Sequence, residues 1–442
     1  MTASSSHAGW RGAARTALRA LALTTLMPLV ASATSYYSWE AVTPAASTGA
    51  SCGNGSPYRF FVNRALFTSK TVIVFEGGGA CWEQKPCQGI AAAGILAATN
   101  PNGIATDYMT NIIGSTAAGG LSAGGLVTPF SARIDPLTSV QTQSWNIVYV
   151  PYCTGDVHAG NQVNVYADSD PTKPLTYYHR GYVNGKALAA WLGANLPNQS
   201  QVLVTGFSAG GVGSTAAYDA IRTAMKAKKT ALLADSGPLM QAPRNGSPDV
   251  YPSVLLHNKI RQVWGLDTPT GIATELIAKY PGKGDINNLG SLTGALAAAY
   301  PNDRMSFATF QMDGVFSAFS YQKFFPEIAA APSGPTRDAL INAKWVPEVA
   351  SWINALKPYG NVGYYIPYER EVVKSHCLTI ITFGGTAIAE ANLDSIGKVV
   401  DNLIDGSGTP IRAWETAKNP QNTPNNSLFD QLSNLIWQAM GL

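Results

Sequence analysis

The sequence predicts an α/β fold in which helices cover both faces of a mostly parallel sheet. Three observations lead to this prediction. Apolar, strand-like runs alternate along the chain with segments of helical periodicity. Each of these runs ends in a loop, which is where open parallel sheets place their ligands. Apolar residues make up 46% of the 442 residues, enough to bury a sizeable core, and the chain holds no internal repeat.

Eight segments supply the expected sheet and its flanking helices. In chain order they are strands at 70–79 and 144–153, a helix at 185–196, a strand at 201–207, a helix at 211–225, and strands at 230–237, 305–314 and 361–369. Residues 238–304 interrupt this rhythm with loop-like and helical stretches, and the strand pattern resumes at Met305. We therefore predict a helical cap at about 238–304, inserted into a single domain that spans 34–442.

The N-terminus has the three parts of a secretory signal peptide. Three arginines precede an apolar run at 20–30, and residues 31–33 are Ala-Ser-Ala, a small-residue cleavage site. The apolar run is well short of the roughly 20 residues that cross a membrane. We predict a signal peptide over 1–33, cleavage near Ala33, and a secreted or periplasmic protein.

Net charge gives no support for a polyanionic partner. The chain carries 30 Lys and Arg against 27 Asp and Glu, and the predicted signal peptide holds three of those arginines and no acid. The remaining chain therefore has 27 charges of each sign. We expect no nucleic-acid partner and no membrane insertion, and the oligomeric state stays open, with a monomer as the expectation.

All five cysteines lie after the predicted signal peptide. In an oxidising compartment they should pair, and the odd number leaves one over. They form no C-x-x-C motif and no Cys/His cluster at zinc spacing, so neither a metal nor a cofactor is expected.

The most informative motif lies where the strand at 201–207 turns into a helix. Residues 206–210 are Gly-Phe-Ser-Ala-Gly, the G-x-S-x-G pattern with a strand before it and a helix after it. The tight turn needs small residues and lifts the serine above the sheet edge, where its hydroxyl can attack. A purely structural corner is the alternative. The flanking elements favour Ser208 as the nucleophile of an α/β-hydrolase-like fold.

A glycine turn, Gly77 to Gly79, follows the first apolar strand. A developing oxyanion needs backbone N–H groups that no side chain obstructs. In α/β-hydrolases such an early turn supplies one N–H group and the residue after the serine supplies the other. We assign the oxyanion hole to Gly78, Gly79 and Ala209. The alternative, a phosphate-binding loop, lacks the following Lys-Ser/Thr and the G-x-G-x-x-G spacing.

The catalytic base follows from chain order by elimination. Four histidines lie after the predicted signal peptide, and the order in this fold is serine, acid, histidine. His158 and His179 precede Ser208, and His257 lies in a predicted cap helix. His376 follows the last clear strand, where the base loop belongs, so we assign the base to His376.

Two aspartates compete for the acid. Asp313 follows a strand and lies between Ser208 and His376 in the chain. Asp235, in the strand that comes next after Ser208, is the rival. We prefer Asp313 because the acid usually lies one or two strands later than Asp235. Either carboxylate could instead cap a turn.

Several longer motifs together resemble the pectin acetylesterase family of Notum-like carboxylesterases. The motifs are FEGGGACWEQKPC at 75–87, VPYCTGDVHAG at 150–160, HRGYVNG at 179–185, GFSAGG at 206–211 and LLADSG at 232–237. The resemblance spans roughly 50–385 and is specific to the family as a combination. It implies an α/β-hydrolase catalytic domain.

The resemblance also implies roles for individual residues. It implies a nucleophile at Ser208, an acid at Asp313 and a base at His376, with the oxyanion hole in the glycine turn and at the residue after the serine. By analogy Asp156 and His158 lie near the site, where they either position the substrate or hold a structural turn.

Two disulfides are implied by the same resemblance. The implied pairs are Cys81 with Cys87 and Cys52 with Cys153. Cys377 is left unpaired beside the proposed base, and we expect it to be a small, buried apolar residue.

These residues predict a secreted serine carboxylesterase that works through an acyl-enzyme. By resemblance, the substrate is an O-acetyl group on a polysaccharide such as pectin or xylan. Aromatic residues just past Asp313 raise an alternative with the same mechanism, in which they line a pocket for longer acyl esters or a polyester. These residues are Phe316, Phe319, Tyr321 and Phe324. A competing class is a non-catalytic carbohydrate-binding module on the same fold, whose mark would be a missing triad residue.

Overall fold

A nine-stranded sheet forms the centre of the fold. In sheet order the strands are β1 (Trp39–Val42), β2 (Phe60–Asn63), β4 (Asn146–Val150), β3 (Lys70–Phe75), β7 (Gln201–Phe207), β8 (Lys229–Asp235), β9 (Arg304–Ala308), β10 (Val362–Ile366) and β11 (Arg412–Trp414). The pairs β1–β2 and β2–β4 are antiparallel, and the other pairs are parallel. The strands from β4 to β11 in this order therefore end at one common edge.

The structure is a computed structural model that describes residues 36–91, 97–109, 128–135, 138–370 and 372–419. The described residues form one compact unit. The predicted signal peptide over 1–33, with its cleavage site near Ala33, lies outside the described residues. Among the described residues, no helix is both long and apolar enough to cross a membrane.

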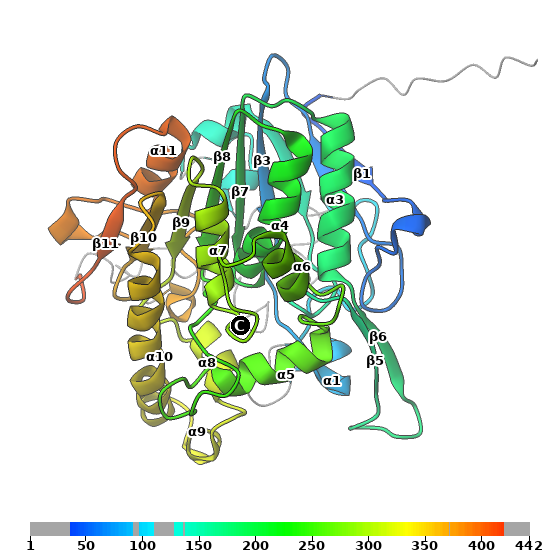
Figure 1. Ribbon diagram of the computed structural model, residues 1–442, viewed down its shortest axis with the longest axis vertical. Helices are drawn as coiled ribbons and strands as arrows, with labels where there is room; N and C mark the ends of the chain where they lie inside the picture. The colour runs from blue at the N-terminus through cyan, green and yellow to red at the C-terminus, as the bar shows by residue number, and fades with distance from the viewer. Residues whose placement is uncertain (1–35, 92–96, 110–127, 136–137, 371, 420–442) are drawn as a thin grey trace, which may run out of the picture. The chain divides into compact units, whose positions relative to one another are not determined.

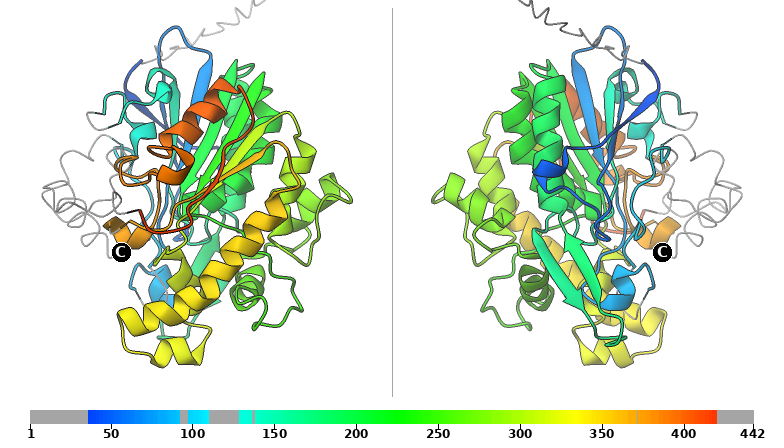
Figure 2. Two further views of the ribbon diagram at one scale, coloured as in Figure 1. Left: turned by 90° about the vertical axis from the view of Figure 1, so that its left-hand side faces the viewer. Right: turned by 90° about the vertical axis from the view of Figure 1, so that its right-hand side faces the viewer.

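Helices cover both faces of the sheet (Figure 1). The longer helices are α3 (Gly181–Asn195), α4 (Ala209–Met225), α5 (Val254–Trp264), α6 (Ile272–Lys279), α7 (Ser291–Ala299), α10 (Pro335–Leu356) and α11 (Gly397–Asp405). The short helices are α1 (Gln84–Cys87), α8 (Phe316–Tyr321) and α9 (Pro326–Ala330). The two opposite views in Figure 2 show α3 and α4 on one face of the sheet and α11 on the other.

The core lies between the central strands and these helices. β4 and β7 are buried along their whole length because helices or other elements cover both faces, and such strands have nearly continuous apolar sequences. For this reason the predicted strands at 70–79, 144–153, 201–207, 230–237, 305–314 and 361–369 all correspond to strands of the sheet.

Some elements have no counterpart in the sequence-based expectation. β5 (Gln162–Tyr166) and β6 (Leu175–His179) form a separate two-stranded ribbon. Most of the β5 residues are only partly buried, so no continuous apolar run marks the strand.

Between β8 and β9, at the predicted insertion, the chain forms the three helices α5, α6 and α7. Figure 1 shows α5 beyond the lower ends of the central strands.

Candidate active site

The common edge of the parallel strands collects the predicted site residues. The glycine turn follows β3, Ser208 follows β7, Asp313 follows β9, and His376 follows β10. One cavity at this edge is lined by the turn, the serine elbow and the histidine loop. Its lining residues include Gly78, Gly79, Ser208, Ala209 and His376.

Ser208 lies at a strained turn between β7 and α4. Its φ of 57° and ψ of −125° lie in a region that residues with side chains rarely adopt. Its N–H donates to the main-chain oxygen of Asp235 at 2.9 Å. A Cβ on Gly206 would lie 2.2 Å from the oxygen of Gly210, and a Cβ on Gly210 would lie 2.1 Å from the oxygen of Phe75. Both glycines of the motif are therefore required by the close approach of backbones.

Asp313 and His376 form a buried pair. The Nδ1 of His376 lies 2.8 Å from the Oδ2 of Asp313. The Oδ1 of Asp313 accepts the N–H groups of Val315 and Phe316 at 3.0 and 2.8 Å, which fixes the carboxylate. The Nε2 of His376 is buried without a hydrogen-bond partner, so Ser208 and His376 line the same cavity without being hydrogen-bonded. Such contacts often tighten only when substrate binds.

Asp235, the rival acid, contacts the backbone beside His376 and not its ring. Its Oδ2 accepts the N–H groups of Leu378 and Thr379, both at 2.8 Å, and the hydroxyl of Thr379 at 2.7 Å. The hydroxyl of Ser236 donates to its Oδ1 at 2.9 Å. Burial raises the pKa of Asp235, and these hydrogen bonds oppose that shift. Of the two aspartates, Asp313 is the one that contacts the imidazole.

The glycine turn after β3 has no room for side chains. A Cβ on Gly77 would lie 2.8 Å from the oxygen of Phe207, and a Cβ on Gly78 would lie 2.2 Å from the hydroxyl of Thr99. Ala209 is the first residue of α4, so its N–H has no partner within the helix. The glycine turn and the start of α4 thus place backbone N–H groups beside Ser208.

Asp156 holds a turn. Its carboxylate accepts the hydroxyl of Thr154 at 2.6 Å and the N–H groups of His158, Gly160 and Gly181 at 3.1, 3.1 and 2.8 Å. It is completely buried, and burial raises its pKa to about 6 against the effect of these hydrogen bonds. Neither Asp156 nor His158 lines the cavity at Ser208.

Glu76 anchors the glycine turn, a role that was not predicted from the sequence. Its buried carboxylate accepts the hydroxyl of Tyr108 at 2.6 Å and the N–H of Tyr152 at 2.9 Å. Its main-chain oxygen lies 2.9 Å from the Nε2 of His158. Burial lowers the pKa of His158 to about 4, so the ring is neutral and donates from Nε2. An acid directly before three glycines was the available signal for Glu76.

The structure contains both disulfides that the resemblance implies. Cys52 is bonded to Cys153, and Cys81 is bonded to Cys87. Cys377 is a free, buried thiol, and burial together with nearby carboxylates raises its pKa.

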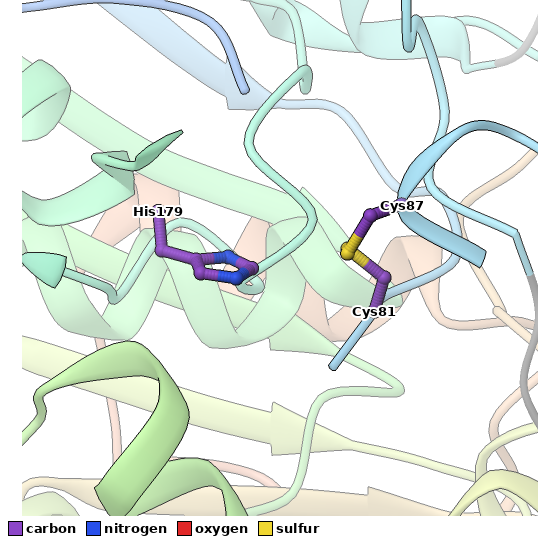
Figure 3. A group of neighbouring side chains, drawn as sticks. All are labelled: Cys81, Cys87 and His179. Carbon is purple, nitrogen blue, oxygen red and sulfur yellow. A yellow bond between two sulfur atoms is a disulfide. The ribbon is translucent and has the colours of Figure 1, made fainter. Parts of the chain in front are cut away.

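Figure 3 shows a group of side chains that has the composition of a metal site. Within the described ranges, Cys81, Cys87 and His179 are the one such cluster with potential ligand atoms this close together. The disulfide occupies both sulfurs. The ring nitrogens of His179 lie 3.0 Å from the oxygen of Thr154 and 2.8 Å from the hydroxyl of Tyr166. The cluster is therefore a disulfide packed beside a hydrogen-bonded histidine.

A larger, almost wholly apolar cavity adjoins the cavity at Ser208. It measures about 720 Å³ including its open side, and helices α4 to α7 contribute most of its walls. Val157, Phe316 and Phe319 line both cavities. Tyr321 and Phe324, which could also have lined a pocket, pack elsewhere. Tyr321 donates to Glu348, and the ring of Phe324 packs on that of Trp82.

Known proteins resemble this chain in sequence and in fold. The pattern of the pectinacetylesterase family matches residues 30–255, which is just over half of the chain. No curated protein matches the sequence. Among solved structures, two crystal forms of the Wnt deacylase Notum from Drosophila each give a TM-score of 0.53 with 16% identity. Each alignment covers 88% of this chain and all of the Notum chain.

The structural match and the family match support different conclusions. At 16% identity the Notum structures show only the fold, a Notum-like α/β-hydrolase fold. The family match covers the glycine turn and Ser208 and ends before Asp313 and His376. Because it spans more than half of the sequence, the chain belongs to the pectinacetylesterase family and is a carboxylic ester hydrolase.

Proposed function

We propose that this chain is a secreted serine carboxylesterase in which Ser208 is the nucleophile, His376 the base and Asp313 the acid. The observation that carries the proposal is the buried Asp313–His376 pair, whose imidazole lines the same cavity as the strained Ser208. The competing class, a non-catalytic binding module, would lack one of these three side chains.

The reaction follows from these positions. The hydroxyl oxygen of Ser208 attacks the ester carbonyl carbon, and the Nε2 of His376 takes its proton. The oxyanion accepts hydrogen bonds from backbone N–H groups, which we assign to Gly78, Gly79 and Ala209. The alcohol leaves with the proton from His376, and an acyl-enzyme remains. Water, deprotonated by the same nitrogen, then releases the acid and restores Ser208.

For the acyl group, the family favours acetyl esters of a polysaccharide such as pectin or xylan. The space directly at Ser208 is small, about 280 Å³ including its open side, which suits an acetyl group. Asp156 and His158 act on substrate only indirectly in this proposal, because both are buried and bonded within the protein. His158 supports the oxyanion turn through Glu76.

A longer acyl group is the second candidate, and the apolar lining of the larger cavity favours it. Phe316 and Phe319 lie between this cavity and the space at Ser208, since they line both. An aliphatic chain attached to Ser208 could extend past these rings and bury its surface, at about 0.8 kcal/mol for each methylene. A short acetyl group would leave the cavity unused.

The domain and the location belong to the same proposal. Residues 34–442 would form the catalytic domain, with 238–304 as a cap, because α5, α6 and α7 supply one side of the apolar cavity. Export is supported by the two disulfides, which persist in oxidising compartments.

The test compares Ser208→Ala and Asp313→Asn with the unmodified protein on acetyl and octanoyl p-nitrophenyl esters and on acetylated pectin and xylan. We expect kcat to fall by about 10⁶-fold for Ser208→Ala and about 10⁴-fold for Asp313→Asn, since each removes one part of the proton relay. Undiminished turnover by Ser208→Ala would overturn the nucleophile assignment. Polysaccharide binding without turnover of any ester by the unmodified protein would favour the binding module. Octanoyl turnover without acetate release would favour the longer acyl group.

A further inference from the structure

The wall of the apolar cavity includes a histidine that the mechanism does not use. His257, on α5, lines the cavity and is 4% exposed, and its Nδ1 has no hydrogen-bond partner. Thr215 is the other uncharged polar side chain of the lining, and its hydroxyl already donates to the oxygen of Gly211 at 3.2 Å. The indole N–H of Trp264, in the same wall, donates to the oxygen of Cys81 at 2.9 Å. Among the buried side-chain nitrogen and oxygen atoms of the described lining residues, the Nδ1 of His257 is thus the one without a hydrogen-bond partner.

A buried ring nitrogen without a partner is unfavourable, because it has lost water and gained nothing in exchange. Burial lowers the pKa of His257 to about 3, and the neighbouring charge of Arg261 acts in the same direction. The ring is therefore neutral, with one donor and one acceptor nitrogen. A hydroxyl group can pair with Nδ1 in either tautomer, since a hydroxyl both donates and accepts.

The cavity lies within reach of a chain that is attached to Ser208. Val157, Phe316 and Phe319 line both the space at Ser208 and the apolar cavity. The wall formed by α4 runs from beside Ala209 to Ala216, about 10 Å at the rise of an α-helix. An acyl chain of medium length therefore spans the distance along this wall.

We propose that His257 recognises a hydroxyl group on the acyl chain, so that the preferred substrates are esters of medium-chain hydroxy acids. The proposal rests on the proposed function, because it takes Ser208 as the point of acyl attachment. The apolar walls accept the methylene groups, and the one unpaired nitrogen accepts or donates the one hydrogen bond that the chain offers. A plain alkyl chain would fill the same space and leave the Nδ1 of His257 unpaired.

The test measures selectivity within each variant. The p-nitrophenyl esters of octanoate and of a series of monohydroxyoctanoates, with the hydroxyl at successive carbons, are compared by kcat/KM. For the best hydroxyl position we expect the kcat/KM of the unmodified protein to be about tenfold higher for the hydroxy ester than for the octanoate ester. One buried hydrogen bond contributes a factor of this size. In His257→Leu this ratio should fall to about one or below. Thr215→Val is the matched control and should keep the ratio, because the Thr215 hydroxyl is already bonded to Gly211. The ratio is independent of the fraction of active protein.

A binding measurement separates this proposal from the proposed function. Titration calorimetry on Ser208→Ala, with His257 intact, should give tighter binding for the hydroxyoctanoate than for octanoate by about tenfold. Equal affinities, or a hydroxy-ester preference that His257→Leu leaves unchanged, would overturn the role of His257 and indicate that Nδ1 is hydrated. Full ester turnover by Ser208→Ala would instead overturn the proposed function, and the calorimetry would still report on His257.

Discussion

At the scale of single residues, Asp235 connects two parts of the candidate site that are far apart in the sequence. Its main-chain oxygen accepts the N–H of Ser208, and its carboxylate accepts the N–H groups of Leu378 and Thr379. These two residues directly follow Cys377, the neighbour of His376. Asp235 therefore acts on the site as a positioning residue, through the backbones that carry the serine and the imidazole.

Asp235→Asn should weaken both stability and turnover. The amide replaces one oxygen by an NH₂ group, which would face N–H donors and leave buried groups unpaired. We expect the free energy of unfolding to fall by about 2–3 kcal/mol and kcat to fall more than KM changes, because the base loop shifts. Urea unfolding and steady-state kinetics measure the two effects. Asp394→Asn, an exposed residue, is the control. Kinetics and stability equal to those of the unmodified protein would contradict the positioning role.

Residue identities were predictable only where chain order and local motifs constrain them. Asp313 and Asp235 both follow the serine and both lie at strand ends. The sequence therefore favours one of them as the acid only through the position that the acid usually has in this fold. What distinguishes them is three-dimensional: the 2.8 Å contact of Asp313 with the imidazole of His376 and the backbone contacts of Asp235. The anchoring role of Glu76 was not predictable because its partners, Tyr108 and Tyr152, come from distant loops.

At the scale of elements, the glycine turn after β3 depends on an ionisable anchor. Glu76 is fully buried at the start of the turn, and its carboxylate is bonded to Tyr108 and Tyr152. Burial raises the pKa of Glu76 from 4.5 to about 7, although these hydrogen bonds oppose the shift. The protonation state of this one side chain is therefore coupled to folding.

Stability should depend on pH through Glu76. Between about pH 4.5 and 7 the folded chain keeps a proton that the unfolded chain has lost, so this contribution to stability falls as pH rises through that window. The full change is at most about 3 kcal/mol. Glu76→Gln, which mimics the protonated form, should lack the effect. Urea unfolding from pH 4.5 to 7.5 should give an unmodified-minus-variant difference that decreases with pH. A difference that stays constant would contradict the shifted pKa.

Elements were predictable where burial is continuous along the sequence. The fully buried β4 and β7 have uninterrupted apolar runs, and the helix after Ser208 follows from its motif. The helix α10 was not expected, because Pro347 lies inside it and proline normally ends a helical pattern. The ribbon of β5 and β6 has largely half-exposed residues, so its alternation is weak.

At the scale of the whole molecule, export and disulfide formation should leave a defined product. When the full chain is expressed with its own N-terminus in an exporting bacterium, we expect the mature protein to begin at Thr34, directly after the predicted cleavage site. Thiol titration should detect no reactive thiol in the native protein and one after unfolding, because Cys377 is buried and the other cysteines are bonded. Intact mass and thiol counts measure both. A product that retains Met1, or a second titratable thiol, would contradict this processing.

The apolar cavity also bears on how such a protein can change over generations. Its walls on one side come from α5, α6 and α7, which all lie between β8 and β9. The proposed bond-breaking groups come instead from the ends of β3, β7, β9 and β10. Substitutions, or exchange of the whole segment between relatives, can therefore alter which acyl groups fit while the reacting atoms keep their supports. In this arrangement the acyl-group specificity of the enzyme can evolve separately from its catalytic residues.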